Sequence, residues 1–268
     1  MNTGLAGKLV IVTGATANIG RAIALGFADE RAALIAVGRD EAAGAKLVAL
    51  AKERGASDAR FVAADMLDPA SPARILAAAV EVGPVDVLIN NVGGNVGAGF
   101  FADSDPQSWM ADIDLNLGTT LRMTHAALPD MIARRSGSIV NIGSTAGIVG
   151  DYMLPVYSAA KAAVHGFTKV LAKEVGQHNI RINCVAPYGT VSTDPAAFST
   201  GSRFRTGFFK EAFEGTSADD MAKRARQTVV GRPVASPEEV ASLVIYLASA
   251  QAGFITGQVY PVDGGSLL

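Results

Sequence analysis

The sequence predicts an α/β fold built on one doubly wound parallel sheet of about seven strands, with helices on both faces. Short apolar runs alternate with longer, Ala-rich helical stretches along the 268 residues. The apolar runs are nearly continuous, which is typical of strands that helices cover on both sides. We find no internal repeat, linker or low-complexity tract in the sequence, and therefore expect a single domain over residues 1–268.

The expected elements follow one another in strict order. Strands are predicted at residues 8–13, 33–37, 60–64, 85–90, 138–143, 180–186 and 258–262. Helices are predicted at residues 19–31, 41–54, 71–82, 105–134, 155–175 and 237–249. Pro72 suits a first helical turn, Gly176 can end a helix, and Ser236 is a residue type that caps one. Residues 187–231 hold no strong strand, so we expect a lid or substrate loop at about 188–230.

Composition favours an ordinary globular protein. Hydrophobic residues make up 49% of the chain and charged residues 18%, which excludes a disordered protein. The net charge of -2 gives no reason to expect nucleic acid or an anionic membrane as a partner. The single cysteine, Cys184, suggests a buried thiol in a reducing compartment. Because no apolar run reaches the roughly 20 residues of a membrane span and no signal peptide is evident, we expect a cytoplasmic protein.

A turn rich in small residues follows the first strand. Between that strand and the first helix lie Gly14, Thr16, Asn18, Ile19 and Gly20. Small residues let the backbone approach a pyrophosphate, and the helix N-terminus supplies unpaired N–H groups. A turn of this kind is a weak signal by itself, because many are purely structural. In this setting it predicts a dinucleotide site on a Rossmann-type sheet.

The end of the second strand bears on the choice of dinucleotide. An NAD site usually has an acidic residue there, whereas this chain has Gly38 followed by Arg39. Arg39 can pair with a 2′-phosphate, which favours NADP over NAD. Two alternatives stay open: Arg39 is a solvated charge, or Asp40 reaches the ribose.

Tyr157 and Lys161 carry the sharpest chemical signal. On a helix the positions i and i+4 lie on one face, so the two side chains point the same way. A tyrosine with its reference pKa of about 10 is a poor base at neutral pH. A nearby ammonium lowers that pKa and makes the phenol a usable general acid and base. An exposed Tyr-x-x-x-Lys pair also occurs by chance.

Together these motifs resemble the short-chain dehydrogenase/reductase family over essentially the whole chain. Thr13 to Gly20 resemble its Thr-Gly-x-x-x-Gly-x-Gly element, with Asn18 in place of the middle glycine and its side chain expected near the diphosphate. The resemblance implies an NAD(P)-dependent oxidoreductase that interconverts a secondary alcohol and a ketone. It implies a homo-oligomer, a dimer or tetramer, through the helices after the fourth and fifth strands.

The resemblance also implies site residues. The catalytic set is Asn116, Ser144, Tyr157 and Lys161. Ser144 would bind the substrate oxygen, Tyr157 would transfer the proton, and Lys161 would hold the nicotinamide ribose. Asn116 would hold a water that links Lys161 to solvent. Further cofactor contacts are implied at Asp65, Met66, Asn91, Gly93, Pro187, Gly189, Thr190 and Val191. Tyr188, an extra residue relative to the family element, places an aromatic ring near the substrate.

The expected substrate loop is rich in aromatic and basic residues. They are Phe198, Phe204, Phe208, Phe209 and Phe213, with Arg203, Arg205 and Lys210 among them. Either amphipathic lid helices pack these rings on the domain, or the rings cover an apolar substrate, cyclic or an acyl thioester. In the second case the basic residues would meet a carboxylate or a coenzyme A phosphate.

Two function classes other than catalysis stay open. The chain is alternatively a catalytically silent subunit or NAD(P)-binding sensor, or a structural partner in a hetero-oligomer. The complete catalytic set favours an enzyme. A metal site is not expected, because His125, His165 and His178 are scattered along the chain.

Overall fold

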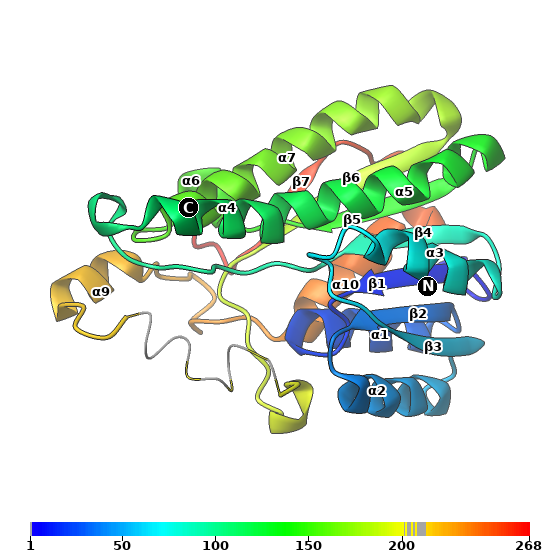
Figure 1. Ribbon diagram of the computed structural model, residues 1–268, viewed down its shortest axis with the longest axis horizontal. Coiled ribbons are helices and arrows are strands. Elements are labelled where there is room, and N and C mark those ends of the chain that lie inside the picture. The colour runs from blue at the N-terminus through cyan, green and yellow to red at the C-terminus, as the bar shows by residue number, and fades with distance from the viewer. Residues whose placement is uncertain (1, 201, 203–204, 206, 208–212) are drawn as a thin grey trace.

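The computed structural model describes residues 2–200, 202, 205, 207 and 213–268. Seven parallel strands form one sheet in the order β3-β2-β1-β4-β5-β6-β7. The sheet runs through the middle of the molecule between two layers of helices (Figure 1). The predicted α/β fold with a doubly wound parallel sheet is therefore confirmed.

The strands are β1 (Leu9–Thr13), β2 (Ala33–Gly38), β3 (Asp58–Ala63), β4 (Val85–Asn90), β5 (Gly137–Ile142), β6 (Ile180–Pro187) and β7 (Val259–Val262). The α-helices are α1 (Asn18–Asp29), α2 (Glu41–Glu53), α3 (Ser71–Val80), α4 (Pro106–Ile113), α5 (Thr119–Arg134), α6 (Ala146–Val149), α7 (Pro155–Val175), α9 (Ala218–Arg224) and α10 (Pro237–Ala248). Short 3-10 turns lie at Phe101–Asp103, Gly176–His178, Pro195–Ala197 and Ala250–Ala252. Each predicted strand is present, and no strand end differs from the prediction by more than two residues. Ser236 is the N-cap of α10, as predicted.

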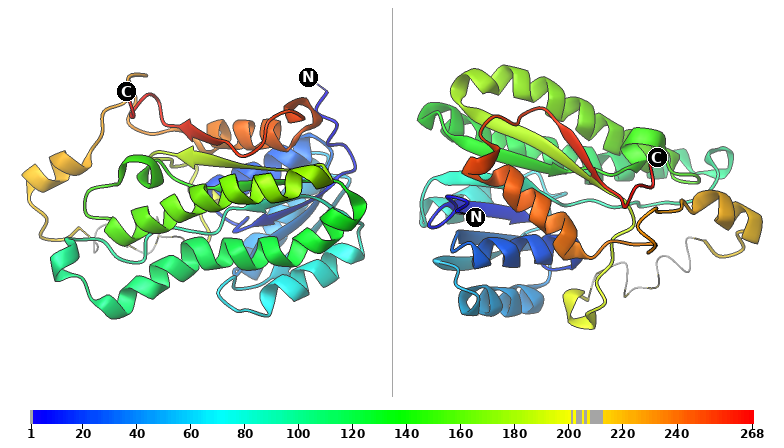
Figure 2. Two further views of the ribbon diagram at one scale, coloured as in Figure 1. Left: turned by 90° about the horizontal axis from the view of Figure 1, so that it is seen from above. Right: turned by 180° about the vertical axis from the view of Figure 1, so that it is seen from behind.

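Alternate side chains along the strands pack into two separate hydrophobic cores, one on each face of the sheet. Val10 and Val12 of β1 face a core that contains residues of α1, α2 and α10. Leu9 and Ile11 face the opposite core, which contains residues of α3, α5 and α7. Because both faces are covered, all five β1 side chains are buried. Figure 2 shows α1 and α10 side by side on one face of the sheet, with α5 and α7 on the other.

The helical region predicted at 105–134 is not one uniform helix. A π-helical turn, η2 (Asp114–Gly118), separates α4 from α5. Asn116 lies in this turn, and its side-chain amide donates to the carbonyl oxygens of Asp112 and Gly94 at 2.8 and 3.0 Å. The Asn116 side chain thus binds the backbone of Gly94, outside the helix, as well as that of Asp112, and the regular α-helical repeat is interrupted at this turn.

The described part of the 188–230 segment holds α9 and the turn Pro195–Ala197. An isolated bridge pairs Thr190 with Ala235 where the segment returns to the sheet. Phe204, Phe208, Phe209, Arg203 and Lys210 lie outside the described residues. No helix within the described residues has the length and apolar character needed to span a bilayer.

Candidate active site

The carboxyl ends of the strands open into one cavity of about 1290 Å³. It lies where the strand order reverses between β1 and β4, the usual ligand position in an open α/β sheet. Every cofactor contact expected from the sequence lines this cavity, and so do Ser144, Tyr157, Lys161 and Tyr188. Asn116 does not line it, and neither do Phe198, Arg205 and Phe213 of the expected substrate loop.

The turn at residues 14–20, between β1 and α1, is the expected phosphate turn, and it leaves no room for side chains at Gly14 and Gly20. A Cβ on Gly20 would lie 2.0 Å from the carbonyl oxygen of Gly14, and Gly14 itself has a φ of +65°. Asn91, at the end of β4, donates from its amide to the carbonyl oxygens of Thr13 and Gly14 at 2.9 and 3.1 Å. The turn is therefore fixed to the neighbouring strand, with its backbone at the cavity wall.

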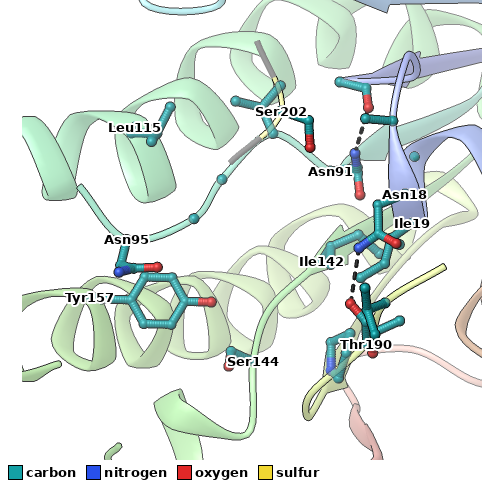
Figure 3. A pocket seen from close by; sticks show the side chains of 18 of the residues that line it. Asn18, Ile19, Asn91, Asn95, Leu115, Ile142, Ser144, Tyr157, Thr190 and Ser202 are labelled. Carbon is teal, nitrogen blue, oxygen red and sulfur yellow. Dashed lines mark hydrogen bonds between the residues drawn. The ribbon is translucent and has the colours of Figure 1, made fainter. Parts of the chain in front are cut away.

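Asn18 holds the turn to a distant part of the chain. Its φ of +44° lies in the left-handed region, which asparagine tolerates better than most residues. Its Nδ2 donates to the carbonyl oxygen of Thr190, and its Oδ1 accepts from the Ser192 amide, both at 3.0 Å. Figure 3 shows the carboxamide directed at Thr190. Both polar groups expected near the diphosphate are thus engaged by backbone groups of this chain.

The part of the cavity beside the end of β2, where the sequence predicts the adenosine, carries Arg39, Asp40 and Asp65. The Arg39 side chain is 68% exposed, and its Nη1 lies 3.9 Å from Asp65. Asp40 Oδ1 accepts from the Ala43 amide at the start of α2, and Oδ2 accepts from the amide and hydroxyl of Thr200. These bonds, that from Ala43 first, lower the pKa of Asp40 to about 2. Both Asp40 oxygens are therefore engaged by the protein.

Tyr157 and Lys161 lie one helical turn apart at the start of α7. Lys161 is 3% exposed, and its Nζ donates to the Ile142 carbonyl oxygen at 2.8 Å. The same Nζ lies 5.9 Å from the centre of the Tyr157 ring. Ser144 follows β5 and is buried except for its cavity surface. Figure 3 shows Tyr157, Ser144 and Asn95 around the same end of the cavity.

Gly93 brings Asn116 and Lys161 together from behind the cavity wall. A Cβ on Gly93 would lie 2.7 Å from Asn116 Oδ1 and 2.8 Å from Lys161 Nζ. Asn116 is fully buried, and its Oδ1 accepts from the Gly94 amide at 2.9 Å. The close approach explains why glycine is needed at position 93, and it places Asn116 beside Lys161.

Arg226 and its neighbours form part of the site that could not be predicted from the sequence. Arg226 Nη2 donates to Thr145 Oγ1 at 2.8 Å and to Asp151 Oδ1 at 2.7 Å. Its guanidinium carbon lies 4.4 Å from the centre of the Tyr188 ring, and its amide donates to the Tyr188 hydroxyl at 3.0 Å. Arg224, Asp151 and Asn95 line the same cavity. No sequence motif marks these residues, because their partners lie far away along the chain.

His165 lies beneath the turn that carries Ser144. Burial, and secondarily the charge of Lys161, lowers the pKa of His165 from 6.5 to about 4. Its ring is close enough to Gly143 and Gly147 to exclude side chains there. His165 is therefore a neutral packing residue at neutral pH. Cys184 packs beside it, and burial raises the pKa of that thiol to about 12.

Comparison with known proteins agrees with this geometry. The model of the short chain dehydrogenase family matches residues 8–200. A 3-oxoacyl-[acyl-carrier-protein] reductase from Chlamydia muridarum is 36% identical over 99% of both chains. A 1,6-dihydroxycyclohexa-2,4-diene-1-carboxylate dehydrogenase from Pseudomonas putida is 34% identical over 100% of this chain and 95% of its own.

A solved structure extends the likeness to three dimensions. The crystal structure of a 3-oxoacyl-[acyl-carrier protein] reductase from Brucella melitensis superposes with a TM-score of 0.79 at 29% identity, covering 98% of this chain and 92% of the other. The fold, the cavity and these relatives lead to one conclusion: the chain belongs to the short-chain dehydrogenase/reductase family and is an NAD(P)-dependent oxidoreductase.

Proposed function

We propose that this enzyme interconverts a secondary alcohol and a ketone by hydride transfer, with NADP(H) as its cofactor and Tyr157 as general acid and base. The observation that carries the proposal is the meeting of Ser144, Tyr157 and Lys161 at one end of a cavity whose other end is a phosphate turn. Such an arrangement joins proton transfer and dinucleotide binding in one site.

The residues present fit a dinucleotide. The turn at Gly14 and Gly20 excludes side chains from the place where a diphosphate approaches the backbone, and the start of α1 supplies N–H groups there. When bound, the nicotinamide supplies or accepts the hydride.

Each residue near the reacting oxygen then has a role. Ser144 donates a hydrogen bond to the substrate oxygen, and Tyr157 gives or removes its proton. Lys161 holds the nicotinamide ribose and favours the tyrosine phenolate. Asn116, behind Gly93, holds a water through which Lys161 exchanges protons with solvent.

The preference for NADP rests on the end of β2. Asp40, the one carboxylate near the ribose position on that strand end, already accepts three hydrogen bonds from the chain. Arg39 is exposed beside the cavity and meets Asp65 only at 3.9 Å. A 2′-phosphate therefore finds an exposed guanidinium, while the chain itself already occupies most of the acceptor capacity of Asp40.

The substrate is proposed to be apolar and cyclic, or an acyl thioester. Leu154, Tyr188, Met221 and Val234 supply apolar surface at the substrate end of the cavity. The names of the two curated relatives describe an acyl group on a carrier protein and a cyclic dihydroxy carboxylate. We further propose a single domain over residues 1–268 with a substrate loop at 188–230, a cytoplasmic location, and a homo-oligomer. Exposed Leu121 on α5 and Val170 on α7 support the last proposal.

The test is a panel of secondary alcohols and 3-hydroxyacyl thioesters, each with NAD⁺ and NADP⁺, followed by absorbance of the reduced nicotinamide. Turnover with a higher kcat/KM for NADP⁺ supports the proposal. Turnover that prefers NAD⁺ contradicts the cofactor assignment alone. Binding of both dinucleotides without turnover of any panel member, or of the matching ketones in reverse, favours the silent subunit or sensor.

A further inference from the structure

The substrate end of the cavity has a surplus of positive charge. Among the described lining residues, its charged members are Asp151, Lys161, Arg224 and Arg226. Three of these four are cations, and the carboxylate of Asp151 already pairs with Arg226 at 2.7 Å. The other charged lining residues, Arg39, Asp40 and Asp65, lie at the adenosine end. A cavity end with this balance attracts an anion.

Arg226 is held in a fixed orientation but not saturated. Nη2 uses its hydrogens on Thr145 and Asp151, and the Tyr188 ring covers one face of the guanidinium. Nε and Nη1 are buried and donate to no group in the described structure. Buried donors without acceptors are rare in native proteins, and a bound water or a ligand group supplies the acceptor at such positions. Thr145 is the chain neighbour of Ser144, and Arg226 lines the same cavity as Ser144, so the guanidinium lies near the residue proposed to bind the reacting oxygen.

Arg224, two residues earlier, has the same character. It stacks on the ring of Phe213, with its guanidinium carbon 4.2 Å from the ring centre. Its Nε is buried without an acceptor, and no carboxylate among the described residues forms an ion pair with it. Arg224 therefore contributes the charge that Asp151 does not neutralise.

We propose that Arg226 and Arg224 bind a carboxylate of the substrate; this inference rests on the proposed function. The substrate is then a hydroxy acid, and its oxidised form is the corresponding oxo acid. A guanidinium beside Ser144 reaches an anionic group only when that group lies close to the reacting carbon. A carboxylate on a small molecule meets this condition. The phosphates of a thioester carrier lie far along its chain from the reacting carbon, so the test treats them as the competing source of the anion.

The experiment compares matched pairs of substrates with wild-type enzyme, Arg226→Gln and Arg224→Gln. Each pair consists of a cyclic or linear 3-hydroxy acid and its methyl ester. Two further substrates are compared with each pair: the corresponding coenzyme A thioester, and the N-acetylcysteamine thioester, which lacks the phosphates of coenzyme A. The readout is the ratio of kcat/KM between acid and ester. A merely structural role of either arginine would lower both values together and leave this ratio unchanged.

We expect wild-type enzyme to prefer the acid over its ester by about ten- to a hundred-fold, and Arg226→Gln to remove most of that preference. Arg224→Gln is expected to reduce this acid-to-ester preference by several-fold. Equal rates for acid and ester, or an unchanged ratio in both variants, overturn the inference while leaving the proposed oxidoreductase intact. A preference for the coenzyme A thioester over both its truncated form and the free acid also overturns it. Failure to oxidise esters and acids alike, or to reduce the matching ketones, would instead contradict the proposed function.

Discussion

Asn18 and Thr190 are joined by a hydrogen bond of 3.0 Å, although 172 residues separate them in the chain. The same Asn18 carboxamide accepts from the amide of Ser192. The phosphate turn after β1 is thus tied to the segment that follows β6. Both segments line the cavity, so one side chain fixes their spacing before any ligand arrives.

Replacing Asn18 by glycine should loosen the 190–192 segment. Asn18→Gly keeps a residue that accepts the left-handed backbone but removes both hydrogen bonds. We expect faster hydrogen exchange at the Ser192 amide and several-fold weaker dinucleotide binding. Asn18→Asp is the matched control, because it keeps the acceptor for Ser192. Unchanged exchange at Ser192 in the glycine variant would contradict the role of Asn18.

Arg39→Ala should separate the two dinucleotides. The side chain is exposed and makes no close ion pair, so its removal costs the fold little. We expect the Kd for NADPH to rise by about ten- to a hundred-fold and the Kd for NADH to stay within about two-fold, as measured by fluorescence titration. Arg39→Lys keeps the charge and should retain part of the preference. Equal weakening of both dinucleotides would argue against a phosphate contact.

The elements that follow local rules could be predicted from the sequence. The seven strands were found because each is a nearly continuous apolar run, and α10 because Ser236 precedes its helical pattern. Tyr157 and Lys161 were brought together by helical spacing alone. The polar strand ends were found because parallel strands deliver them to one edge.

The features that could not be predicted from the sequence depend on contacts between residues that lie far apart in the chain. The π-helical turn at Asn116 is tied to Gly94, which lies 22 residues away in the chain. Arg226 reaches Thr145 and Asp151 across 81 and 75 residues. The Asn18 carboxamide could not be oriented from the sequence, because its partners follow β6. No local pattern encodes such pairings.

His165 should make stability depend on pH. Burial lowers its pKa to about 4 from 6.5, so between these values the unfolded chain binds a proton that the folded protein does not. The free energy of unfolding should therefore fall as the pH drops from 6.5 to 4, by on the order of 3 kcal/mol from this group.

The measurement is urea unfolding of wild type and His165→Gln between pH 7.5 and 4.5. The variant lacks the titrating ring, so the gap between the two curves should shrink as the pH falls. The two proteins share all their Asp and Glu residues, so the pH dependence that these carboxylates cause cancels in the difference between the two free energies of unfolding. Parallel curves would show that His165 titrates normally.

The most direct test of the account is Tyr157→Phe, which keeps the ring and removes only the hydroxyl. We measure kcat with the best substrate of the panel, together with the Kd for NADPH. The account predicts a fall in kcat of about 10²- to 10⁴-fold with little change in the Kd, because the proton donor is lost while the dinucleotide contacts remain. Retention of most of the wild-type kcat would contradict Tyr157 as general acid and base, and with it the proposed mechanism.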